Sequence, residues 1–196
     1  MSPIRLHQPM ARSPLRTYAL PLAVTFAAVF LLFQLYVYWQ QTRPVFDAQG
    51  KLLRLPEFEF PLLEGKGKCT ADLLRNEPVV VVYYGPDCGH CRKLGKELAT
   101  SSSEIDAIQW VFVSRAPAHE AKAYAQETGL AAHPSVYLCR DEQARFYQYF
   151  GEMYIPSVYV FNSQRKFLQS LHQNTEIQDI LDVLHRKRVV KHKETK

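Results

Sequence analysis

Two cysteines separated by two residues, Cys88 and Cys91, are the side chains of this sequence best suited to chemistry. They follow a run of six apolar or aromatic residues, 79–84, which predicts a strand covered on both faces and ended by a Gly-Pro turn. Beyond the turn, Cys91, Leu94 and Leu98 recur at helical spacing, so we expect a helix that begins directly after Cys88. Free N–H groups at the positive end of that helix stabilise a Cys88 thiolate, whereas Cys91 shares the buried face. The spacing therefore predicts thiol–disulfide exchange, in which Cys88 attacks and Cys91 resolves.

Other uses of a C-x-x-C pair fit the sequence less well. Haem attachment requires a histidine directly after the second cysteine, where this chain has Arg92, and structural zinc requires a second ligand pair. A metal chaperone that binds copper through Cys88, His90 and Cys91 stays open as an alternative. In the redox interpretation His90 has a role as well, because an imidazolium beside Cys88 favours the thiolate.

Composition and charge exclude several classes of protein. With 196 residues and 47% hydrophobic content, the chain is long enough for one ordinary domain with a sizeable core. The net charge of +5 comes from the ends of the chain, because residues 186–196 carry six Lys or Arg against one Glu. Residues 40–184 carry 15 basic and 18 acidic residues, so we expect no nucleic-acid partner.

An uncharged segment, residues 17–42, lies near the N-terminus, and three arginines but no acidic residue precede it. Its length predicts a transmembrane signal anchor at 17–39, with residues 1–16 in the cytoplasm and a linker at 40–54. A cleaved signal peptide is the alternative, but the run is long for one, and Tyr36, Tyr38 and Trp39 at its end are typical of an interfacial belt. The expected location is a bacterial inner membrane, crossed once, with the C-terminal domain in the periplasm.

The folded domain is expected at 55–184, followed by a basic tail at 185–196. Alternating residues from 58 to 62 and a turn at 65–68 predict a short N-terminal β-hairpin. Thr175 and Gln178 predict a capping box for a closing helix at 177–184. The elements expected between these ends are strands at 108–113, 134–139, 158–161 and 166–171, a helix at 118–128 and helical turns at 144–150.

A β-α-β half with C-x-x-C at its first helix, then Ile-Pro before a hairpin and a terminal helix, resembles the thioredoxin superfamily. The segment 58–66, together with 72–74, is similar to the opening of TlpA-like and redoxin-type envelope proteins, which are commonly membrane-anchored. The resemblance implies an α/β thioredoxin fold: a mixed central sheet flanked by helices, with the N-terminal hairpin as an extension. It also implies that Pro156 is cis and faces the cysteines, and that Ile155 offers backbone to a substrate chain.

The resemblance further implies a thiol–disulfide oxidoreductase that needs no bound cofactor beyond a redox-active Cys88–Cys91 disulfide. Its expected partners are protein thiols or disulfides and a membrane electron donor. We favour the reducing direction, with a disulfide oxidase or isomerase of the same fold as the alternative, because Gly-His between the cysteines is the dipeptide of eukaryotic disulfide isomerases.

The sequence departs from the superfamily pattern at three positions. Asp87 replaces the tryptophan common before the first cysteine, Val82 replaces the buried acid that handles protons, and Lys96 replaces the helix proline. Asp87 is a candidate substitute for the missing acid, although its charge opposes a thiolate at Cys88.

Two further cysteines, Cys69 and Cys139, fall at predicted strand ends. They are either a structural disulfide, which persists outside the cytoplasm, or two buried, inert thiols.

Overall fold

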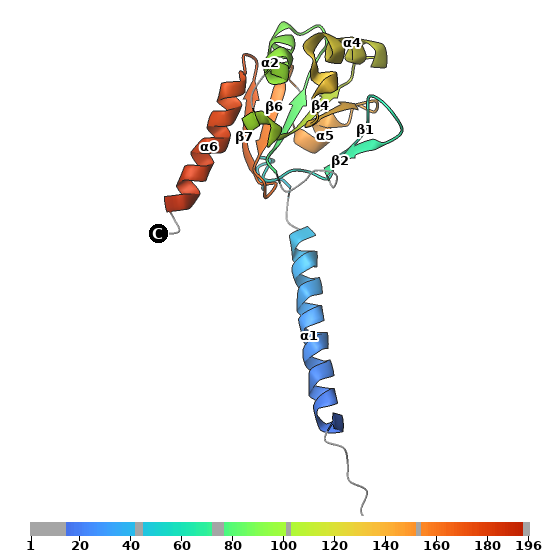
Figure 1. Ribbon diagram of the computed structural model, residues 1–196, viewed down its shortest axis with the longest axis vertical. Helices are drawn as coiled ribbons and strands as arrows, with labels where there is room; N and C mark the ends of the chain where they lie inside the picture. Colours follow the sequence, from blue (N-terminus) through green and yellow to red (C-terminus); the bar gives the residue numbers. More distant parts are fainter. Residues whose placement is uncertain (1–14, 42–44, 72–76, 101–102, 152–153, 194–196) are drawn as a thin grey trace, which may run out of the picture. The chain divides into compact units, whose positions relative to one another are not determined.

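The computed structural model describes residues 15–41, 45–71, 77–100, 103–151 and 154–193. The chain divides into two compact units, Met1–Arg43 and Pro44–Lys196. In the first unit, α1 is Leu15–Gln41 (Figure 1). None of the helices in the described residues is both long enough and apolar enough to cross a membrane. The transmembrane segment expected at 17–39 stays a prediction from sequence, and most of the expected cytoplasmic segment 1–16 lies outside the described residues.

A mixed five-stranded sheet forms the centre of the second unit, in the order β5-β4-β3-β6-β7 (Figure 1). β3 pairs in parallel with β4, and β4 with β5, whereas β6 and β7 run antiparallel to their neighbours. All of β3 is buried, which confirms the prediction that it is covered on both faces. The strands are β3 (Val79–Tyr83), β4 (Gln109–Ser114), β5 (Val136–Arg140), β6 (Ser157–Phe161) and β7 (Phe167–His172).

One face of the sheet is covered by helices. Val80 and Val82 of β3 point to this face and pack in one apolar cluster with side chains of α2, α4 and α6. The burial follows from the side-chain alternation of a strand, which sends every second residue to the same face. The elements of this layer are α2 (Gly89–Thr100), α3 (Ser103–Asp106), α4 (Ala118–Thr128), the 3-10 turn η2 (Leu130–Ala132) and α6 (Ile177–Lys193).

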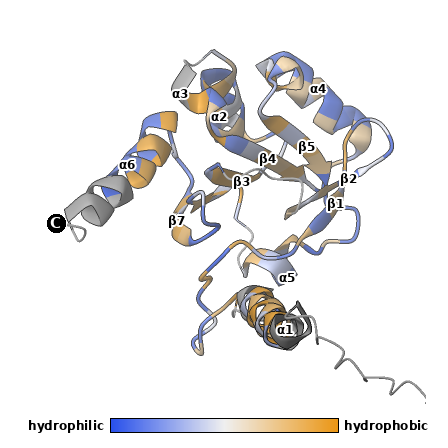
Figure 2. Ribbon diagram, turned by 60° about the horizontal axis from the view of Figure 1, so that its bottom comes forward, coloured by the Kyte–Doolittle hydropathy of each residue, from blue (hydrophilic) through white to orange (hydrophobic). Residues whose placement is uncertain are grey.

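The other face is covered by an aromatic layer. Val79, Val81 and Tyr83 of β3 pack there against α5 (Phe146–Phe150) and a small antiparallel hairpin, β1 (Glu59–Pro61) and β2 (Lys68–Thr70). Phe146 stacks on Phe150, with ring centroids 4.4 Å apart. In Figure 2 the hairpin lies beside β5, at one edge of the sheet. The predicted N-terminal hairpin is therefore confirmed as a separate two-stranded sheet.

The element boundaries agree closely with the sequence predictions, with two corrections in the closing helix. The helix expected at 118–128 is α4, and Gly129 ends it with a left-handed φ of 83°. The capping box predicted at Thr175 and Gln178 is wrong, because the Thr175 hydroxyl donates to a carbonyl oxygen of the preceding turn and Gln178 bonds within the helix. The carboxylate of Asp179 takes the capping role and accepts the free N–H of Glu176 at 2.9 Å, since a charged oxygen is the stronger acceptor. α6 also continues to Lys193, well past the predicted end at 184.

Candidate functional site

The turn between β3 and α2 places Cys88 immediately before the first residue of a helix. The Cys88 N–H donates to the Gly85 carbonyl oxygen at 3.1 Å and closes the turn. The Cys88 carbonyl oxygen accepts the N–H of Arg92 at 3.0 Å, which begins the helical hydrogen bonding. Cys88 therefore sits at the helix mouth, as the spacing predicted.

The two sulfur atoms have different surroundings. Cys88 is partly exposed, and its Sγ accepts the backbone N–H of Cys91 at 3.2 Å, a contact that stabilises negative charge on the sulfur. Cys91 is only 1% exposed and packs with Leu94 and Leu98. Burial first, and then the hydrogen bond to the Cys88 side chain, raise the pKa of the Cys91 thiol to about 12. The arrangement suits an accessible attacking thiol and a protected resolving thiol.

The loop before β6 faces this turn. The Ile155–Pro156 peptide bond is cis, as the resemblance implied. A Cβ added at Gly85 would lie 3.4 Å from Ile155 Cγ2 and 3.9 Å from Cys88 Cβ, so the Ile155 side chain is a neighbour of Cys88. Pro156 is buried, whereas Ile155 is 52% exposed and Tyr154 is 63% exposed. The structure thus brings together the residues predicted as nucleophile and as substrate platform, beside exposed apolar surface.

The other two predicted site residues point to solvent. His90 is exposed, and it has no hydrogen-bond or ion-pair partner among the residues that the structure describes. The Asp87 side chain is fully exposed and lies 4.0 Å from a guanidinium nitrogen of Arg92. Asp87 therefore directs its charge toward Arg92, and a solvated carboxylate there does not replace the buried acid lost at Val82.

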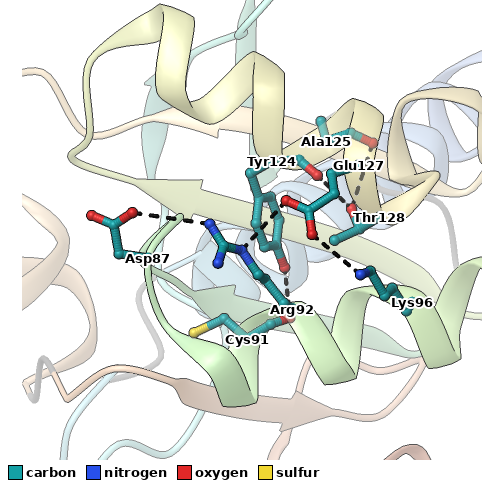
Figure 3. Close-up of polar contacts among 8 residues, drawn as sticks. All are labelled: Asp87, Cys91, Arg92, Lys96, Tyr124, Ala125, Glu127 and Thr128. Atoms are coloured by element: carbon teal, nitrogen blue, oxygen red, sulfur yellow. Dashed lines mark hydrogen bonds and ion pairs between the residues drawn. The ribbon is translucent and has the colours of Figure 1, made fainter.

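A charged network that the sequence did not predict joins α2 to α4 (Figure 3). The carboxylate of Glu127 lies 3.5 Å from Arg92 Nε and 3.2 Å from Lys96 Nζ. Arg92 thus stands between Glu127 on α4 and Asp87 on the active-site turn. The partners are about half exposed, so the network orients side chains more than it stabilises the fold.

Next to this network, Tyr124 of α4 is hydrogen-bonded to the backbone of the second cysteine, Cys91. Its hydroxyl donates to the Cys91 carbonyl oxygen at 2.8 Å (Figure 3). Its ring stacks on Tyr84, with ring centroids 4.4 Å apart. Gly95 of α2 makes this approach possible, because a Cβ there would lie 2.8 Å from the Tyr124 hydroxyl. Tyr124 falls within the helix expected at 118–128, but nothing in the helical pattern identified its partner.

The remaining predicted residues lie away from this site. Cys69 and Cys139 are both buried, on the face of the sheet opposite to α2. In the described residues, no three His, Cys, Asp or Glu side chains converge on a position that could hold a metal ion. The ligand set of the metal-chaperone alternative, Cys88, His90 and Cys91, is therefore not assembled.

A sheet of this order, with a cysteine pair at the start of the helix after its central strand and a cis proline in the loop beside that turn, defines a thioredoxin fold. Residues 66–155 match the thioredoxin family model, so this part of the chain is similar to that family. No curated protein has a sequence that matches the chain significantly.

Solved structures with the same fold include several disulfide-exchange proteins. A secreted disulfide oxidoreductase of Mycobacterium tuberculosis, described as homologous to Escherichia coli DsbE, is 16% identical, with a TM-score of 0.54 over 64% of this chain and 91% of its own. A putative protein disulfide isomerase of Bacteroides thetaiotaomicron is 20% identical, with a TM-score of 0.56 over 71% and 92%. A thiol:disulfide interchange protein of Chlorobium tepidum is 16% identical, with a TM-score of 0.56 over 68% and 94%. At these identities the likeness establishes the fold.

Proposed function

We propose that this protein is a thiol–disulfide oxidoreductase that exchanges electrons with protein disulfides through Cys88 and Cys91. The observation that carries the proposal is the division between the two sulfurs: Cys88 is accessible and accepts a backbone N–H, whereas Cys91 is buried one helical turn away. Only an accessible thiolate can attack a bulky disulfide, and only a neighbouring thiol can release the product.

In the reducing direction, the Cys88 thiolate attacks one sulfur of a substrate disulfide, and the other substrate sulfur leaves as a thiolate. The Cys91 thiol then loses its proton to the departing thiolate or to water and attacks Cys88 Sγ. The Cys88–Cys91 disulfide forms, and the second substrate sulfur is released, so two electrons have moved from the pair to the substrate. The exposed apolar side chains of Tyr154 and Ile155 offer a contact for an extended substrate next to the attacking sulfur.

We propose the reducing direction on electrostatic grounds. An oxidant of this class needs a strongly stabilised reduced form. Here Cys88 Sγ accepts the N–H of Cys91, the exposed Asp87 adds no positive charge, and burial penalises charge on Cys91. Each turnover then requires a dithiol reductant, and an electron donor in the membrane is the partner proposed for this step. An equilibrium potential near that of an isomerase would favour the oxidising alternative.

The proposed activity is tested with the full-length chain in mild detergent, with insulin as the disulfide substrate and dithiothreitol as the reductant. We expect the wild-type chain to accelerate insulin precipitation and Cys88→Ser to proceed at the uncatalysed rate. Cys91→Ser is the matched variant. It keeps the attacking sulfur of Cys88 and can form the mixed disulfide, but it lacks the thiol that completes the turnover. Undiminished catalysis by Cys88→Ser would refute Cys88 as the nucleophile.

We also propose, from the sequence, that residues 17–39 anchor the domain outside the cytoplasmic membrane. Residues 17–42 carry no charge, and apolar side chains along the helix, such as Leu22 and Phe26, are 67% and 77% exposed. Arg5, Arg12 and Arg16 before the segment favour a cytoplasmic N-terminus. The test is alkaline extraction of membranes with a C-terminal reporter. Retention of an intact chain whose reporter is periplasmic supports the anchor, and release of the chain or cleavage after residue 30 contradicts it.

A further inference from the structure

The two cysteines outside the active site meet where the hairpin packs against the edge of the sheet. Leu62, just after β1, forms an antiparallel bridge with Cys139 of β5. The N–H of Leu63 donates to a β5 carbonyl oxygen at 2.8 Å and continues the pairing. Phe60 pairs with Cys69 across the hairpin. Cys69 and Cys139 are therefore both neighbours of the short segment 60–62, although they lie about 70 residues apart in sequence.

Their surroundings are apolar and closed to solvent. Cys69 is 0% exposed and Cys139 is 1% exposed, and both belong to the cluster that contains Phe60 and Phe146. The two thiols are hydrogen-bonded to each other, and this bond, after burial, holds the pKa of Cys139 well above its usual value. Each sulfur thus faces the other in a cluster built of aromatic and branched side chains.

The two cysteines come from separate elements, β2 and β5. Of the four cysteines in the chain, two form the active-site pair, and the other two are free thiols in the structure that share one buried cluster from separate elements. The pairing of Cys69 with Phe60 and the bridge of Cys139 to Leu62 hold the two cysteines beside the same three-residue segment, and a covalent bond would bring their sulfurs to roughly 2.05 Å. The backbone pairing of the hairpin with β5 fixes both cysteines in place.

We propose that Cys69 and Cys139 form a structural disulfide that staples the hairpin to the edge strand of the sheet. The two thiols give up two protons and two electrons, and a second disulfide, in a protein oxidant or in glutathione disulfide, accepts them and becomes two thiols. The oxidant must act before the hairpin has docked, since the folded cluster admits no reagent. An oxidising compartment, as in the proposed function, supplies that class of oxidant.

The staple has a definite mechanical role. β5 is an edge strand, and the hairpin supplies its bridge at Cys139. An edge strand that loses its cover exposes backbone groups to pairing with other chains. A covalent link across about 70 residues of chain restricts the unfolded state and keeps this cover in place. The link lies on the face of the sheet opposite to Cys88 and does not take part in the exchange cycle.

The first test is peptide mapping of the full-length wild-type chain, which needs no substitution. The chain is refolded in detergent with glutathione disulfide, alkylated in denaturant without reduction, digested and analysed by mass spectrometry. We expect a peptide that links Cys69 to Cys139. Alkylation of both as free thiols, or linkage of either to Cys88 or Cys91, would overturn the proposal.

The second test measures the staple in the Cys88→Ser/Cys91→Ser background, where only one cysteine pair remains. We expect the oxidised form to melt about 5 to 15 °C above the form kept in dithiothreitol, and this shift to vanish when Cys139 is also changed to alanine. Equal melting temperatures of the oxidised and reduced forms would overturn the stapling role.

This test is independent of the catalytic proposal. Cys69→Ala/Cys139→Ala, with Cys88 and Cys91 intact, is expected to keep insulin reduction at 25 °C. Undiminished exchange by Cys88→Ser would refute the catalytic proposal without bearing on the Cys69–Cys139 link, and absence of that link would not bear on the exchange chemistry.

Discussion

Gly95→Ala tests the close contact between the active-site helix and α4. The added Cβ would lie 2.8 Å from the Tyr124 hydroxyl and 3.1 Å from Cβ and Cγ2 of Thr128, distances that require one of the helices to move. Neither neighbour yields easily, because Tyr124 is 2% exposed and hydrogen-bonded to Cys91, and the Thr128 hydroxyl bonds to the Tyr124 carbonyl oxygen at 2.8 Å. Overpacking of this kind costs about 1 to 3 kcal/mol of unfolding free energy.

Helix propensity acts in the opposite direction, because alanine is favoured over glycine in a helix by up to ~1 kcal/mol. Gly89→Ala is the matched control: Gly89 opens the same helix, and no atom lies within 4 Å of its added Cβ. We therefore expect Gly95→Ala to be less stable than Gly89→Ala by about 1 to 3 kcal/mol, or ~2 to 4 °C in melting temperature for each kcal/mol.

The assay is guanidinium unfolding of the reduced full-length chain in detergent, followed by tryptophan fluorescence. The slope of the transition should be the same for both variants, because the exposed area is the same. Equal midpoints for the two alanine variants would refute the inferred packing of Gly95 against Tyr124 and Thr128.

Three further predictions concern the site itself. Because the pKa of the Cys91 thiol is raised from 9.0 to about 12, its thiolate fraction at pH 8 falls about 1,000-fold. When the reduced chain is treated with iodoacetamide, mass spectrometry should therefore find Cys88 alkylated and Cys91 intact. The raised pKa also means that the buried thiol contributes stability that is present below pH 9 and lost as pH rises toward 12, so the unfolding free energy of the reduced wild type should fall more steeply in this range than that of Cys91→Ala. Tyr124→Phe removes the hydrogen bond to the Cys91 carbonyl oxygen and should cost about 0.5 to 1.5 kcal/mol of unfolding free energy, whereas Glu127→Gln, which breaks half-exposed ion pairs, should cost less than about 1 kcal/mol.

The order of elements followed from the sequence because each has a strong local signal. The β-branched run before Cys88 has the composition of a strand buried on both faces, and Gly129 marks the end of α4 through the left-handed conformation that glycine adopts without strain. The Ile155–Pro156 bond was expected to be cis from the resemblance alone, and the structure confirms it. The end of α6 was set too early because a run of basic residues was interpreted as a tail rather than as a continuing helix.

The contacts between elements did not follow from the sequence. The approach of Tyr124 to Cys91 depends on how two helices cross, and that crossing is decided by a single missing Cβ at Gly95. The meeting of Cys69 and Cys139 depends on which sheet edge the hairpin covers, which neither local pattern nor spacing specifies. Long-range contacts of this kind are set by packing, so the sequence left both cysteine alternatives open.

Trapping of a mixed disulfide identifies the cysteine that attacks a substrate. Full-length Cys91→Ala is reduced, freed of reductant and challenged with a folded protein that contains one accessible disulfide, and the products are separated without reduction. We expect a covalent adduct whose linked peptide contains Cys88, since the attacking sulfur remains and the resolving thiol is gone. The adduct should be absent from Cys88→Ser/Cys91→Ala. An adduct through Cys69 or Cys139, or no adduct while the disulfide of the challenge protein is still reduced, would contradict the assignment of Cys88 as the attacking residue.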